Sequence, residues 1–149
     1  RYMPRMFGKL LSAFSAPSPA PAPDAPLALS ALLVRLARAD GDYTATEAAG
    51  IDGLIAARYE MSLPEATAAR RGGEALEAEA SDTVRFTRAL KDAVPHEERA
   101  GLMEALWSVA VSDGTRDADE DALIRLAASL LGVNARDSAL ARQRVERGT

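Results

Sequence analysis

Apolar residues recur along most of this chain at the three- and four-residue spacing of one face of an α-helix. One apolar row leads into Asp40, and a second leads in the same way into Asp113. A shift of 73 positions carries the first row onto the second, pairing Leu33 with Leu106, Leu36 with Val109, and Ile51 with Ile124. The pattern therefore predicts two copies of one helical hairpin.

Each hairpin has an acidic turn with the sequence Asp-Gly, five residues and Glu, at residues 40–47 and 113–120. The glycine is the residue that best tolerates the left-handed conformation in which helices commonly end. Thr44 in the first turn and Asp117 in the second stand three residues before the closing glutamate, which is the spacing of a capping box. The first helix of each hairpin should therefore end at the Asp-Gly pair, and the second should begin at the cap.

The N-terminal region, residues 1–26, is expected to lie outside the helical domain at 27–149. Residues 6–14 have the apolar spacing of a short amphipathic helix, and residues 15–26 are a Pro- and Ala-rich linker that favours an extended chain. The amphipathic helix could contact a membrane surface or a partner. The favoured interpretation is that it packs on its own domain.

Between and after the hairpins, further helix boundaries are predicted. Ser62 has the spacing of a capping box with Glu65 and should start a helix, which Gly72-Gly73 should weaken or break. Pro95 should begin the helix that leads into the second acidic turn, and Asn134 should cap the last one. The predicted fold is all-α: a single compact bundle of about seven helices with an internal pseudo-twofold repeat of hairpins, plus the short N-terminal amphipathic helix.

The amino-acid composition excludes several kinds of site and classes of function. Hydrophobic residues make up 48% of the chain and aromatic residues only 5%, which favours helices over sheets. The absence of cysteine excludes disulfides and thiolate metal sites. A net charge of −4 without a basic cluster argues against a nucleic-acid partner, and no apolar run is long enough to span a membrane. His96 stands alone, without a nucleophile that would make a triad. We expect a cytoplasmic, non-enzymatic protein without an organic cofactor.

The acidic turns allow two interpretations. Asp40, Glu47, Asp113 and Glu120 could converge if the hairpins pack as a pair, and hard oxygen ligands without His or Cys suit Mg²⁺, Ca²⁺ or Mn²⁺. In the alternative, the same residues only cap helices. An EF-hand is not indicated, because Ala118 and Ile124 occupy the positions of its glycine and its bidentate glutamate.

The doubled acidic turn at this separation resembles the tellurite-resistance TerB-like family, in particular its stand-alone bacterial members, over residues 27–144. The resemblance implies an all-α fold with a pseudo-twofold, acidic residues on one side, and a role in the metal-ion, tellurite or stress response, often near membranes. It carries the family's acidic pairs onto Asp40 with Glu47 and Asp113 with Glu120. The expected function is cation binding, or binding of a protein partner, through the acidic turns. The alternative is a structural scaffold, either co-chaperone-like or membrane-associated.

Overall fold

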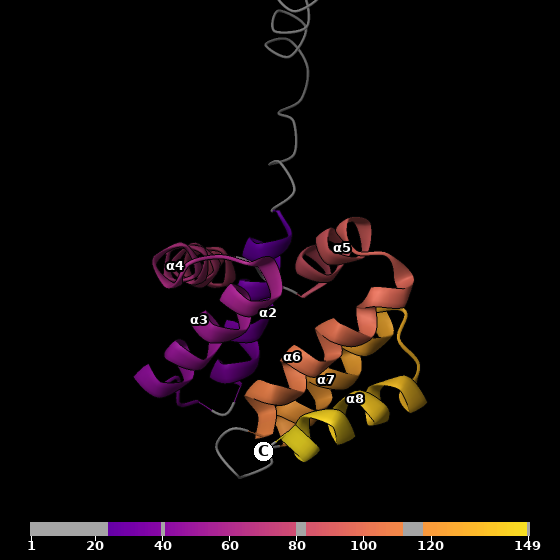
Figure 1. The fold of residues 1–149 in the computed structure, drawn as a ribbon. Helices are drawn as coiled ribbons and strands as arrows, with labels where there is room; N and C mark the ends of the chain where they lie inside the picture. The colour runs from indigo at the N-terminus through magenta and orange to yellow at the C-terminus, as the bar shows by residue number, and fades with distance from the viewer. Residues whose placement is uncertain (1–23, 40, 80–82, 112–117, 149) are drawn as a thin grey trace, which may run out of the picture.

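The described part of the protein is entirely helical. The computed structural model describes residues 24–39, 41–79, 83–111 and 118–148, with the backbone alone at 118–120. These ranges form seven α-helices and one 3-10 turn and contain no strand; Figure 1 shows their arrangement. They are α2 (Ala25–Arg38), α3 (Ala45–Tyr59), α4 (Leu63–Glu79), α5 (Val84–Ala93), η1 (His96–Glu98), α6 (Arg99–Val111), α7 (Ala118–Leu131) and α8 (Ala135–Gly148). The prediction of an all-α bundle is confirmed. The predicted amphipathic helix at 6–14 lies outside the described residues.

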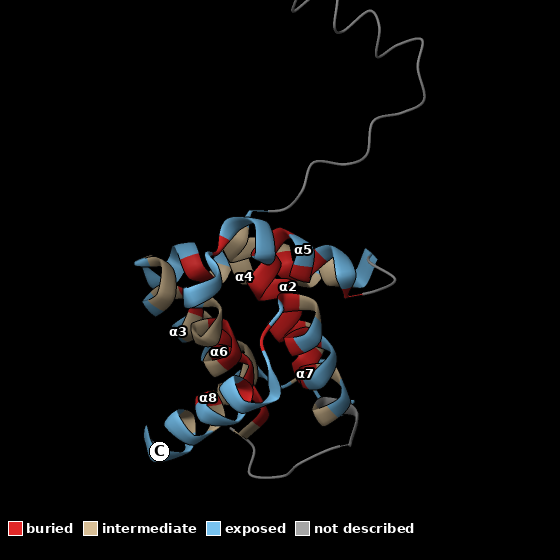
Figure 2. Cartoon of the chain, turned by 90° about the vertical axis from the view of Figure 1, so that its right-hand side faces the viewer, coloured by how far each residue is buried: buried red, intermediate tan, exposed pale blue. Residues whose placement is uncertain are grey.

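Helix α2 is the centre of the core. Nine of its 14 residues are buried, because its sequence is apolar on nearly every side. It contacts α3, α4, α5, α6 and α7. Figure 2 shows buried residues along α2 and on the sides of the helices that face it. Arg35 is a charged residue on this mostly apolar helix, and its Nε lies 3.2 Å from Glu77 Oε2.

The two predicted hairpins extend into two three-helix halves. In the first half α2 packs against both α3 and α4, and in the second half α6 packs against both α7 and α8. The predicted register holds in the core, since Leu33, Leu106, Ile51 and Ile124 are all at most 2% exposed. The apolar repeat predicted the first two helices of each half, and the third helix of each half was predicted from its cap, at Ser62 and at Asn134.

Helix α4 departs from the prediction that Gly72-Gly73 would weaken or break it. It continues unbroken through both glycines to Glu79. Gly73 is buried, and a Cβ there would lie 2.6 Å from Ser30 Cβ and 2.8 Å from the backbone nitrogen of Ala31. The missing side chain therefore allows α4 to approach the backbone of α2 closely, and this packing keeps the helix intact where local propensity would weaken it.

The helix starts predicted at Ser62 and Asn134 are confirmed, whereas Pro95 is followed by the 3-10 turn η1 and α6 begins only at Arg99. Ser62 and Glu65 form a reciprocal capping box, and Asn134 Oδ1 accepts a bond of 2.8 Å from the Asp137 amide. Helix α2 begins two residues earlier than the predicted domain start, because Asp24 caps it and Pro26 is tolerated in the first turn of a helix.

Candidate functional site

The first acidic turn joins α2 to α3. Gly41 has a φ of +87°, the left-handed conformation expected of it. The Glu47 amide donates to Thr44 Oγ1 at 3.1 Å, and the Thr44 amide donates to Glu47 Oε1 at 3.0 Å, so the predicted capping box is confirmed. Both bonds that Glu47 accepts in the described structure fall on Oε1. The cap therefore uses one oxygen of this carboxylate. Asp40 lies outside the described residues.

The second acidic turn lies largely outside the described structure. Helix α6 ends at Val111 and α7 begins at Ala118, so Asp113 falls between the described segments, and the side chain of Glu120 is not described either. Helices α2 and α6 both end toward the lower side of the fold in Figure 1. Convergence of Asp40, Glu47, Asp113 and Glu120 stays a prediction.

The first turn is anchored by a polar network that the sequence analysis did not identify. The Tyr43 hydroxyl donates to Glu74 Oε2 on α4 at 2.6 Å, and the Arg38 guanidinium lies 5.3 Å from the Tyr43 ring centroid. Arg70 continues the network by pairing with Glu74 at 2.7 Å and with Asp52 on α3 at 2.6 Å. The network ties the turn, α3 and α4 into one unit. The spacing of Arg70 and Glu74 as an i,i+4 pair could have been recognised in the sequence, but the pairing with Asp52 could not.

The electrostatics of this network favour its present protonation state. Burial and the hydrogen bond to Glu74 raise the pKa of Tyr43 to about 12. Burial acts to raise the pKa of Glu74, but the hydrogen bonds from Tyr43 and Arg70 outweigh it and lower that pKa. The hydrogen bond to Asp52 raises the pKa of Arg70. Tyr43 therefore stays neutral while Glu74 and Arg70 stay charged over the physiological range.

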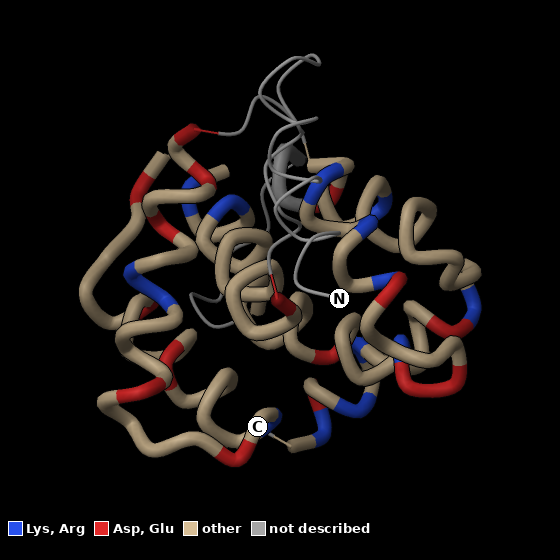
Figure 3. Tube along the Cα trace, turned by 90° about the horizontal axis from the view of Figure 1, so that it is seen from above, with Lys and Arg blue, Asp and Glu red and all other residues tan. Residues whose placement is uncertain are grey.

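Several carboxylates of the described helices pair with arginines. Asp52 and Glu74 pair with Arg70, and Glu77 pairs with Arg35 and Arg38. Within the described ranges no group of three or more His, Asp or Glu side chains could hold a metal ion. Of the four predicted ligands, Glu47 is the one whose side chain is described. Figure 3 shows acidic and basic positions interleaved along the outer helices.

A cleft of about 450 Å³ separates α7 from α8. Trp107 of α6 lines it, and its indole Nε1 donates to Ser138 Oγ at 3.2 Å. The Arg142 guanidinium lies 5.3 Å from the Trp107 ring centroid. Trp107 is 8% exposed and belongs to the hydrophobic core.

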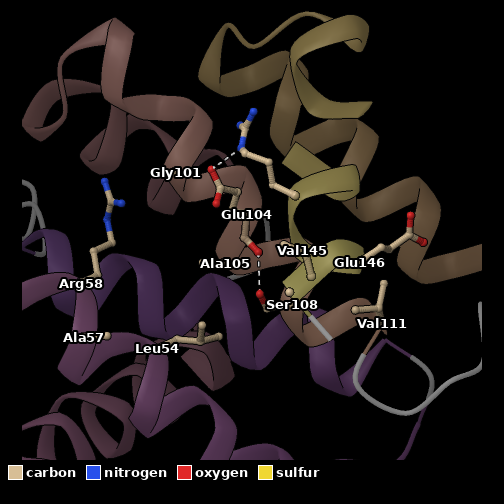
Figure 4. Close-up of a pocket in the computed structure, with 12 residues that line it drawn as sticks. Leu54, Ala57, Arg58, Gly101, Glu104, Ala105, Ser108, Val111, Val145 and Glu146 are labelled. Atoms are coloured by element: carbon tan, nitrogen blue, oxygen red, sulfur yellow. Dashed lines mark hydrogen bonds and ion pairs between the residues drawn. The ribbon is translucent and has the colours of Figure 1, made fainter. Parts of the chain in front are cut away.

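A larger cleft, of about 820 Å³, lies between α3, α6 and α8. Figure 4 shows Arg58 of α3 on one side and the C-terminal part of α8 on the other. Glu104 within it accepts a bond of 2.9 Å from Arg144. The lining extends to Val111, the last described residue before the second acidic turn.

Among the described helices, none combines the length and the apolar character needed to cross a membrane.

The chain was compared with protein-family models, with curated proteins and with solved structures. The family model described as "Tellurite resistance protein TerB" matches residues 26–143, which is most of the chain. The comparisons of this chain with the curated proteins and with the solved structures found no match. The matched span covers α2 to α7 and most of α8, including both acidic turns. The chain is therefore a member of the TerB tellurite-resistance family.

Proposed function

We propose that this TerB-family protein binds a divalent cation, Mg²⁺, Ca²⁺ or Mn²⁺, through its paired acidic turns, and that it acts without catalysis in a cytoplasmic response to metal or tellurite stress. The observation that carries the proposal is the duplicated turn itself, with an Asp-Gly-x5-Glu sequence after α2 and again after α6. The ligands would be Asp40, Glu47, Asp113 and Glu120. Grouped carboxylates repel one another unless a cation neutralises them, and oxygen ligands suit these hard ions.

The bonding of Glu47 is compatible with this role. Its Oε1 accepts from Thr44, and a carboxylate that caps a helix through one oxygen can offer the other to a cation. The two tasks support each other, because a bound cation would hold the glutamate in its capping orientation.

The test is thermal unfolding of the full chain during titration with MgCl₂, CaCl₂ or MnCl₂. The wild type should gain thermal stability, since binding to the folded state alone adds about 2.7 kcal/mol at a free concentration one hundred times the Kd. The double variant Asp40→Asn/Asp113→Asn should gain nothing, because an amide keeps the size of the side chain and removes its charge. Asp92→Asn, at an exposed position on α5, is the matched control and should respond as the wild type does. An equal response in all three proteins would rule out the turns as the site.

The second candidate function is a protein-interaction scaffold whose acidic residues only cap helices. It is favoured by the complete Thr44–Glu47 capping box, which needs no ligand. Under this alternative Thr44→Ala should lower the free energy of unfolding by about 1 kcal/mol, equally with and without added cation. Under the cation proposal the loss should be smaller with cation present, because the ion would help to order the turn.

A further inference from the structure

The cleft between α3, α6 and α8 has the size and lining of a small-molecule site. Its volume of about 820 Å³ lies within the usual range for ligand pockets, roughly 300 to 1,000 Å³. Leu54, Ala105, Val111 and Val145 give it an apolar lining, as Figure 4 shows. Such sites are mostly apolar with a few polar groups that orient the ligand.

The charges in this cleft leave one cation without a counter-ion. Glu104 pairs with Arg144 at 2.9 Å, and Glu146 pairs with Arg142 at 3.1 Å. Arg58 forms no ion pair with any other described residue, and the polar group that it meets is the neutral hydroxyl of Tyr59, whose pKa it acts to lower. Its Nε is buried without a hydrogen-bond partner, and its guanidinium lies 5.8 Å from the ring centroid of Tyr59.

Other groups near Arg58 do not supply that counter-ion. On its other side Arg58 also lines a small hollow with Glu98, but the two side chains do not form an ion pair within the described structure. A partly buried guanidinium donor without an acceptor is costly, so an acceptor brought by a ligand would be favoured.

Gly101 sets the position of Arg58. A Cβ at residue 101 would lie 2.8 Å from Arg58 Nη1, so the glycine allows the guanidinium to lie against the backbone of α6. This close approach holds the cation in the cleft rather than in open solvent. In Figure 4 Arg58 lies on the Gly101 side of the cleft, while the Glu104 carboxylate pairs with Arg144.

We propose that this cleft binds a small soluble anionic amphiphile, a molecule with one carboxylate on an apolar chain. The carboxylate would accept hydrogen bonds from Arg58, whose planar guanidinium matches it in a bidentate pair. The apolar chain would lie over Leu54, Ala105 and Val145, toward Val111.

Decanoate is the probe, and its Kd is measured on the full-length protein by ¹H–¹⁵N NMR titration. Shifted amide signals should map to the cleft helices α3, α6 and α8. Butyrate should bind more weakly, since each methylene removed from water contributes about a three- to fourfold gain in affinity. Decyltrimethylammonium, with the same chain length and the opposite charge, should bind at least about tenfold more weakly than decanoate.

Two variants test the roles of Arg58 and Gly101. Arg58→Met should raise the Kd for decanoate by about tenfold or more, because it removes a charge-assisted hydrogen-bond donor but keeps a long apolar side chain. Gly101→Ala should also weaken binding, because its methyl displaces the guanidinium. Its thermal stability should not fall, since alanine favours the helix and the end of a flexible side chain can move away. Arg71→Met, at an exposed position on α4, makes the same charge change elsewhere and should leave the Kd unchanged.

The proposal is overturned if decanoate binds no better than decyltrimethylammonium, if Arg58→Met binds decanoate as tightly as the wild type, or if the shifted signals lie outside the cleft. Binding to vesicles of phosphatidylglycerol that decanoate does not compete away would likewise overturn it in favour of a membrane surface.

Discussion

The two three-helix halves share a buried register but differ in how their second and third helices meet. In the first half α3 contacts α4 extensively, and Arg70 bridges them through Asp52 and Glu74. In the second half α7 and α8 make few contacts with each other, and a cleft over Trp107 lies between them. The same apolar repeat can therefore build one closed and one open unit, because polar residues outside the repeat decide how the third helix packs.

One pair of equivalent positions shows that the third helices also differ where they face their central helices. Gly73 of α4 corresponds to Glu146 of α8 by the shift of 73 positions. Gly73 is buried against the backbone of α2, whereas the side chain of Glu146 is 47% exposed beside Arg142. A residue without a side chain lets the third helix of the first half approach the backbone of its central helix closely, whereas the equivalent position of the second half carries a side chain that stays at the surface.

The largest predicted effect is at Gly73. Gly73→Ala places a methyl group 2.8 Å from the Ala31 nitrogen, a backbone atom that cannot move without shifting α2. We expect the free energy of unfolding to fall by about 3 kcal/mol, as measured by urea denaturation.

Gly72→Ala is the matched control for this prediction. Its methyl would meet only Leu27 Cδ1, at 2.8 Å, and that side chain can rotate. Since alanine gains about 1 kcal/mol over glycine in a helix, this variant should stay within about 1 kcal/mol of the wild type. Equal losses in the two variants would show that the close α2–α4 approach is not what separates the halves.

An intermediate effect is expected from the bridge between α3 and α4. Arg70→Met leaves the carboxylates of Asp52 and Glu74 partly buried without their cation. Breaking a fully buried pair costs about 3 to 5 kcal/mol, and these side chains retain some exposure, so a loss of about 2 kcal/mol is expected in urea denaturation. Arg71→Met, at the adjacent exposed position, should change stability by less than about 0.5 kcal/mol.

The pH dependence of the free energy of unfolding gives a second test of the bridge that Arg70 makes between α3 and α4. The pKa of Glu74 is lowered from 4.5 in the folded protein, so its ionised form contributes stability at higher pH and loses that contribution as the pH falls through the folded-state value. Because Arg70 helps to lower this pKa, the Arg70→Met variant should lose less stability than the wild type on acidification from about pH 5 to about pH 3. Parallel pH profiles for the two proteins would contradict this account of the network.

The smallest predicted change in stability is in the second half, formed by α6, α7 and α8. Ser138→Ala removes the acceptor at 3.2 Å from the Trp107 indole nitrogen and should lower stability by about 1 kcal/mol. Trp107 is the chain's one tryptophan, so its fluorescence reports the change directly. The emission should shift if water enters the cleft. Ser129→Ala, at an exposed position lining the same cleft, should leave both stability and emission nearly unchanged.

The sequence determined the features that depend on residues close together in the chain. The apolar spacing predicted an all-α fold and the register that buries Leu33 and Leu106. The capping-box spacing predicted the caps at Thr44 and Ser62. A helix face and its cap are set by interactions between residues three or four positions apart, which a short segment encodes completely.

The tertiary structure decided how the helices meet. Arg70 finds Asp52, 18 positions away, and Arg58 lies against Gly101, 43 positions away, only because the helices that carry them pack side by side. In the same way, the close approach of α2 keeps α4 continuous through two glycines that weaken a helix locally. Contacts of this kind depend on how several helices pack together. They therefore cannot be predicted from the spacing of residues within a single segment.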